Sequence, residues 1–73
     1  MGFSANKVAK DVKKIIDEFW SGQCEKEEAT KRIKGILDDP ERRIKVMRGE
    51  NYTGVFENVL GKKRIAEFEE LMK

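Results

Sequence analysis

The sequence predicts an all-α domain of four to five short helices in one compact, bundle-like unit. Apolar residues recur three and four positions apart along most of the chain, which is the spacing of a helix face. Glycines and a single proline separate these periodic stretches. Because the 73 residues contain no internal repeat, low-complexity tract or linker, the whole chain (1–73) is expected to form one domain.

The first two helices are predicted to form an antiparallel hairpin. The first begins after Ser4 or Asn6, either of which can cap it, and ends at Ser21-Gly22. Its apolar stripe is broader than a coiled-coil seam and consists of Val8, Val12, Ile15, Ile16, Phe19 and Trp20. The second runs from about Glu25 to Leu37, and the short turn between them makes the pair antiparallel.

Two residues of this hairpin have specific expected roles. Trp20 is expected to be the large core side chain where the first helix meets the second. Gly35 weakens the second helix by about 1 kcal/mol relative to alanine, but it would permit a close helix crossing.

A short third helix is predicted from Pro40 to about Arg48. Asp39 can cap it and proline suits its first position. Ile44 and Met47, three residues apart, are its expected inward pair, whereas Val46 interrupts the pattern.

The last two helices are predicted to meet at Gly61. Thr53 can cap the fourth, and Gly61 ends it in a left-handed conformation before the fifth resumes at once. The apolar positions of the two helices are Val55, Phe56, Val59, Leu60, Ile65, Phe68, Leu71 and Met72.

The charge balance and the cysteine count limit the class of protein. Sixteen basic and fourteen acidic residues give a net charge of +2, too small to indicate a nucleic-acid-binding protein by bulk electrostatics. The lone Cys24 excludes an intrachain disulfide and favours a reducing cytosol. Without the apolar run of a leader or of a membrane span, the expectation is a cytoplasmic protein that does not bind membranes.

The side chain most often used in acid–base catalysis is missing. The sequence contains no histidine, so Cys24 has no imidazole activator and the commonest general base is absent. Adjacent carboxylates such as Glu27-Glu28 lie at helix edges or on solvated faces. A phosphate loop ending at Gly61-Lys62 would need glycine in place of Phe56 and Ser or Thr in place of Lys63. We therefore expect no enzymatic activity, no metal and no cofactor.

A resemblance to known proteins centres on the stretch Leu60-Gly61-Lys62-Lys63-Arg64. Further matching residues are Trp20 and Gly22, Glu27 and Glu28, and Thr53. In this pattern, from about Val8 to Met72, the chain resembles a family of small uncharacterised helical proteins of Gram-positive bacteria and their mobile elements. The resemblance implies a helical fold and no particular activity. Cys24 stands where this pattern has an aliphatic residue, which argues against a thiol function.

Two groups of cations are candidate anion or nucleic-acid contacts. Lys62, Lys63 and Arg64 open the last helix, where free backbone N–H groups also favour an anion. Alternatively, they complement the carbonyl end of the preceding helix, with Arg64 paired to a carboxylate such as Glu57. The second group lies one short helix upstream and scatters around three sides of a helical wheel, as solvated side chains do; it comprises Arg42, Arg43, Lys45 and Arg48.

Two hypotheses for function follow. The first is a non-enzymatic intracellular interaction module that binds a protein partner or a second copy of itself, because the core of so short a chain is small. The alternative is nucleic-acid or phosphate binding through the basic start of the last helix, with the upstream cations in support. In that case Trp20, Tyr52 and Phe3 could stack on single-stranded bases.

Overall fold

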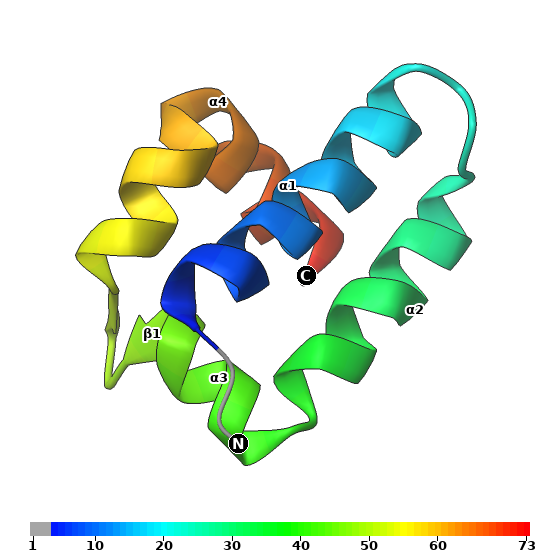
Figure 1. Cartoon of the computed structure of the whole chain (residues 1–73). Helices are drawn as coiled ribbons and strands as arrows, with labels where there is room; N and C mark the ends of the chain where they lie inside the picture. Colours follow the sequence, from blue (N-terminus) through cyan, green and yellow to red (C-terminus); the bar gives the residue numbers. More distant parts are fainter. Residues whose placement is uncertain (1–3) are drawn as a thin grey trace.

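Helix α1 (Ala5–Trp20) contacts each of the other three helices, and in Figure 1 it lies between α4 and α2. The computed structural model describes residues 4–73 of the chain. The remaining elements are, in order, α2 (Lys26–Leu37), α3 (Pro40–Val46), β1 (Met47–Arg48), β2 (Asn51–Tyr52) and α4 (Gly54–Leu71). The predicted all-α class is confirmed, with the addition of a small two-stranded ribbon that the sequence did not lead us to expect.

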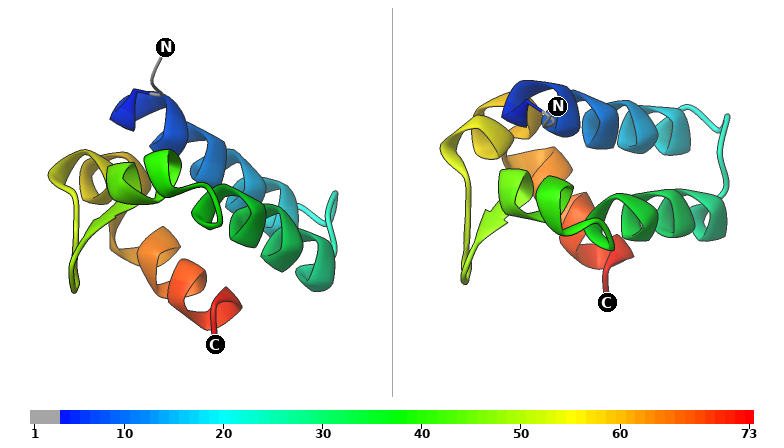
Figure 2. Two further views of the ribbon diagram at one scale, coloured as in Figure 1. Left: turned by 90° about the horizontal axis from the view of Figure 1, so that it is seen from below. Right: turned by 60° about the horizontal axis from the view of Figure 1, so that its bottom comes forward.

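The ends of α1 are set by local chemistry. The hydroxyl oxygen of Ser4 accepts a hydrogen bond of 3.1 Å from the backbone N–H of Lys7, which satisfies one of the free donors of the first turn. At the other end Gly22 has a φ of 85°, which lets the chain leave the helix. Helix α2 then returns antiparallel beside α1 (Figure 2), as predicted.

The core is a single cluster of apolar side chains to which all four helices contribute. It includes fourteen buried apolar residues, five of them from α1, and no buried polar residue among those described. The largest fully buried members are Phe56, Ile16, Ile33, Leu60, Val8, Val12 and Val46. Because the N-terminal half of α1 and the start of α4 both supply such residues, the core depends on contacts between distant parts of the sequence.

Two expectations about the first hairpin are wrong. Trp20 is not a core side chain between α1 and α2: it is 46% exposed, and its indole Nε1 donates to Glu67 in α4. Gly35 does not mark a close helix crossing, since a Cβ added there would meet no atom within 4 Å. Its position in α2 is open to solvent.

The third helix is shorter than predicted, and Val46 rather than Ile44 faces the core. It ends at Val46, and the chain then forms β1 and β2, which pair Met47 with Tyr52 and Arg48 with Asn51. Val46 is fully buried, whereas Ile44 is 57% exposed. Val46, which interrupted the helical pattern, therefore belongs to the core. Of the expected pair, Ile44 lies on the surface, whereas Met47 is partly buried against the core.

Helix α4 has a sharp break at Gly61, where φ is 78° and ψ is 170°. Only glycine adopts such a conformation readily. Gly61 therefore separates the fourth and fifth predicted helices at the expected position. The hydroxyl of Thr53 caps the first half by accepting from the N–H of Phe56 at 3.3 Å. Figure 1 shows the first half of α4 beside α1 and the second half leading back towards the C-terminus. Within residues 4–73, no helix has both the length and the apolar character needed to cross a membrane.

Candidate interaction surface

The two groups of cations singled out in the sequence do not form one surface. Lys62 and Lys63 directly follow the break inside α4. In Figure 1 this break between the two halves of α4 lies near the top, whereas α3 and β1 lie at the bottom.

Arg64 joins α4 to α1. Its Nε donates to the Asp17 carboxylate at 2.8 Å, and its Nη1 donates to the Leu60 carbonyl at 3.4 Å. The guanidinium carbon also lies 5.4 Å from the centre of the Trp20 ring. The alternative in which Arg64 complements the preceding carbonyl end is thus confirmed, but its carboxylate partner is Asp17 rather than Glu57. Lys62 and Lys63 remain exposed beside it.

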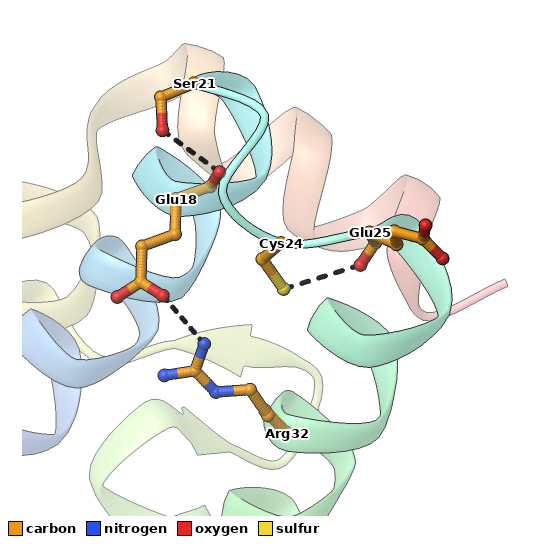
Figure 3. Close-up of polar contacts among 5 residues, drawn as sticks. All are labelled: Glu18, Ser21, Cys24, Glu25 and Arg32. Carbon is orange, nitrogen blue, oxygen red and sulfur yellow. Dashed lines mark hydrogen bonds and ion pairs between the residues drawn. The ribbon is translucent and has the colours of Figure 1, made fainter.

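Near the turn between α1 and α2, a second arginine joins two helices through a carboxylate (Figure 3). Arg32 of α2 reaches the Glu18 carboxylate at 2.9 Å, and this hydrogen bond raises the pKa of Arg32. Ser21 Oγ donates to the Glu18 carbonyl, and the Cys24 thiol donates to the Glu25 carbonyl at 3.4 Å. Cys24 is only 5% exposed, which fits a small apolar side chain rather than a reactive one.

The aromatic side chains proposed to stack on bases have partners within the molecule. The Tyr52 ring stacks on Phe56 with 5.4 Å between ring centres and meets the edge of Phe68 at 5.9 Å. Its hydroxyl donates to the Glu69 carboxylate at 2.9 Å. Burial, and then this hydrogen bond, raise the pKa of Tyr52 to about 12. Phe3 lies outside the described residues.

A different surface gathers exposed apolar side chains with cations, and we call it the Ile44 surface. It consists of Ile44, Val55, Arg43, Lys45 and Arg48. Ile44 and Val55 are 57% and 38% exposed, so each leaves a substantial apolar area in water. The three cations are among the candidate contacts expected from the sequence, whereas Ile44 was expected to face inward and Val55 was named only as an apolar helix position.

Two shallow grooves flank Ile44. The first has a volume of about 540 Å³, and its lining includes Val55, Lys45 and Arg48. The second has a volume of about 410 Å³, and its lining includes Arg43, Met47 and Arg48. Ile44 and Arg48 line both grooves and therefore form the wall between them.

The Ile44 surface is unbalanced in charge. Among the described residues that line its two grooves there are three cations and no carboxylate. A larger groove along α2 mixes four lysines with Glu27, Asp38 and Glu70. The groove beside α1 likewise mixes three lysines with Asp17 and Glu18. Those two surfaces have the mixed charge of ordinary solvated helices.

Arg42, the fourth cation of the upstream group, differs from its neighbours. Its Nε donates to the carboxylate of Asp39 at 3.2 Å, and this same carboxylate caps α3 by accepting from the N–H of Glu41. Arg42 therefore helps to hold the start of α3.

Within residues 4–73, no three cysteine or carboxylate side chains gather closely enough to hold a metal ion.

The fold and this surface define a small helical protein that exposes two aliphatic side chains beside three cations. The chain belongs to a family described as conserved hypothetical protein, whose model matches residues 4–73. No curated protein and no solved structure matches the chain. The family match agrees with the expected membership of a group of uncharacterised proteins.

Proposed function

We propose that this chain is a non-enzymatic interaction module that binds another protein through the Ile44 surface. The observation that supports this most directly is the exposure of Ile44 and Val55 on one groove. Full burial of such a side chain contributes roughly 1.5–3 kcal/mol. The third exposed large apolar residue, Trp20, already has Arg64 and Glu67 as partners.

The small size of the surface indicates a transient complex. Two exposed aliphatic side chains and three cations are fewer than the roughly 20–30 residues a side of a standard stable interface. The domain therefore fits a role in which it recognises a short segment of its partner.

Self-association through this surface would be opposed by charge. In a two-fold symmetric dimer the same patch faces itself, so Arg43, Lys45 and Arg48 of one copy would approach those of the other. Like charges held close together destabilise an interface. A partner that supplies carboxylates fits better than a second copy of this chain.

The nucleic-acid or phosphate alternative rests on Lys62 and Lys63. Arg64 is engaged with Asp17 and Trp20. The upstream cations belong to α3 and β1, which lie at the opposite end of Figure 1 from the break in α4. A two-lysine contact would release few counterions and so bind weakly at physiological salt.

The setting of the protein is part of the same proposal. The lone thiol favours the cytoplasm. The Leu60-Gly61-Lys62-Lys63-Arg64 stretch provides both the break in α4 and the contact with α1. Because the same stretch carries the resemblance to small helical proteins of Gram-positive bacteria and their mobile elements, we propose that relatives of this chain occur there.

A site-specific cross-linking experiment tests the proposed function. A photoreactive amino acid is placed at Ile44 in one variant and at Lys62 in another, both exposed positions, and each is irradiated in cells. We expect a protein adduct from position 44 and none from position 62. A nucleic-acid adduct from position 62, with none from position 44, would overturn the proposal in favour of the alternative. Circular dichroism of both variants confirms that they fold.

A further inference from the structure

We infer that the segment recognised by the Ile44 surface is an acidic peptide stretch with two apolar side chains, one on each side of Ile44, and a carboxylate between them that meets Arg48. This inference rests on the proposed function and adds the chemistry of the partner to it.

The arrangement of the grooves determines the apolar part of the pattern. Ile44 projects between the two grooves and lines both. An apolar side chain in the first groove can reach Ile44 and Val55, and one in the second can reach Ile44 and Met47. A single anchor would cover only one flank of Ile44. Two anchors would remove most of its exposed area from water, which is the main source of affinity available at this surface.

The charges determine the acidic part of the pattern. Arg43, Lys45 and Arg48 make no ion pair with any described residue, whereas Arg32, Arg42 and Arg64 each pair with a carboxylate. Arg48 is the cation that lines both grooves, so it lies where the middle of a bound segment would pass. A guanidinium binds a carboxylate through two parallel hydrogen bonds, which gives this position geometric specificity.

The same features favour a peptide over a nucleic acid or a membrane. A phosphate backbone would pair with the cations but leave Ile44 and Val55 without an apolar partner. Stable binding to an anionic membrane requires a broad apolar helix face, and the exposed aliphatic residues here are two side chains from different elements.

A random peptide display selection tests this inference. The library is selected on the immobilised wild-type chain, with removal of peptides that also bind the Ile44→Asp variant. We expect the enriched peptides to contain two apolar residues separated by a short stretch with Asp or Glu. Enrichment of apolar peptides without carboxylates would overturn the inferred chemistry and leave the proposed function standing. Failure to enrich any Ile44-dependent peptide would contradict both.

Charge variants then test the role assigned to Arg48. An enriched acidic peptide should bind Arg48→Glu at least about tenfold more weakly than wild type, and raising the salt concentration should weaken wild-type binding. Lys62→Glu, a matched charge reversal at the other end of the molecule, should leave the affinity unchanged. Equal losses in both variants would show a general charge effect and refute the assignment. Binding of anionic vesicles or oligonucleotides that Ile44→Asp and Arg48→Glu abolish would likewise refute a peptide ligand.

Discussion

At the scale of single residues, Arg64 is a side chain with several simultaneous partners. It bridges Asp17, the Leu60 carbonyl and the face of Trp20. An exposed ion pair contributes about 0.2–1 kcal/mol, and a cation over an exposed aromatic ring about 0.5–1 kcal/mol. Together they fasten the second half of α4 to the end of α1.

Arg64→Ala should therefore lower the free energy of unfolding by about 1–2 kcal/mol. Lys63→Ala removes the neighbouring exposed cation, and we expect almost no effect from it. Urea denaturation followed through the fluorescence of the single tryptophan measures both. If the two variants lose the same stability, the contacts of Arg64 do not stabilise the fold.

Tyr52 provides a prediction about pH. Because burial and the Glu69 carboxylate raise its pKa to about 12, above the ordinary value of 10.0, the folded chain holds the phenol proton more tightly than the unfolded chain. The stabilisation is complete below pH 10 and is lost as the pH rises towards 12. Ultraviolet absorbance of the only tyrosine should show this raised pKa. Glu69→Gln should lower it part of the way, since burial remains. A wild-type value at the ordinary pKa would contradict the packing of this ring.

Ile44 and Val46 are two residues apart, but truncation to alanine should cost stability only at Val46. Val46→Ala leaves a cavity in the core and should cost about 2 kcal/mol of unfolding free energy. Ile44→Ala removes only exposed area and should change stability by less than about 0.5 kcal/mol. Thermal or urea unfolding of the pair measures this contrast, and a larger loss at position 44 would place that side chain in the core after all.

At the scale of elements, two glycines have opposite roles although an added Cβ would meet no atom within 4 Å at either one. Gly35 lies inside α2 with ordinary helical geometry, so Gly35→Ala should stabilise the chain by about 0.5–1 kcal/mol. Gly61 has a φ of 78°, so Gly61→Ala should destabilise it by about 1–3 kcal/mol through backbone strain alone. Urea denaturation of both variants measures this: with m-values unchanged, the midpoint should rise for Gly35→Ala and fall for Gly61→Ala. Stabilisation by Gly61→Ala would mean that α4 continues through position 61 without a break.

Sequence patterns predicted the elements whose local signals agree with the tertiary packing. Ser4, Asp39 and Thr53 cap their helices as expected, and Gly61 breaks α4 where expected. These features depend on neighbouring residues only, which is why they can be inferred from sequence. The bounds of α2 were likewise predicted to within a residue.

The region from Ile44 to Tyr52 could not be assigned in this way, because its burial is decided by distant contacts. Ile44 with Met47 and Val46 alone are both acceptable inward choices for so short a helix. Packing against α1 and α4 buries Val46 fully, leaves Ile44 on the surface and keeps Met47 partly buried against the core. One local signal was available: Gly49-Glu50 joins β1 and β2, and a two-residue loop beginning with glycine is typical of a tight hairpin turn.

The candidate site was consequently predicted only in part. Its three cations can be identified from the sequence, because the charge of a lysine or an arginine does not depend on the fold; they are Arg43, Lys45 and Arg48. The apolar half, Ile44 and Val55, was assigned to the core because an aliphatic residue at helical spacing is usually buried. A surface made of both kinds of residue can be recognised only when the structure shows which apolar residues are buried and which are exposed.

At the scale of the whole molecule, the position of the unpaired cations bears on oligomeric state. The Ile44 surface combines apolar area, which favours association, with three cations that make no ion pair among residues 4–73 and oppose symmetric pairing. At physiological ionic strength the screening length is about 8 Å, so cations facing each other across an interface still repel. We therefore predict that the chain sediments as a species of about 8.5 kDa over a wide concentration range.

Salt should reveal the balance between these two forces. At about 1 M salt the screening length falls to roughly 3 Å, so the repulsion weakens while the apolar attraction persists, and weak dimerisation becomes possible. Ile44→Asp should abolish any such dimer, whereas Lys62→Glu should not. A dimer that already forms at low salt and is lost in Ile44→Asp would identify the Ile44 surface as a homodimer interface. In that case its cations would have to meet carboxylates of the second copy, and the acidic partner would be this chain itself.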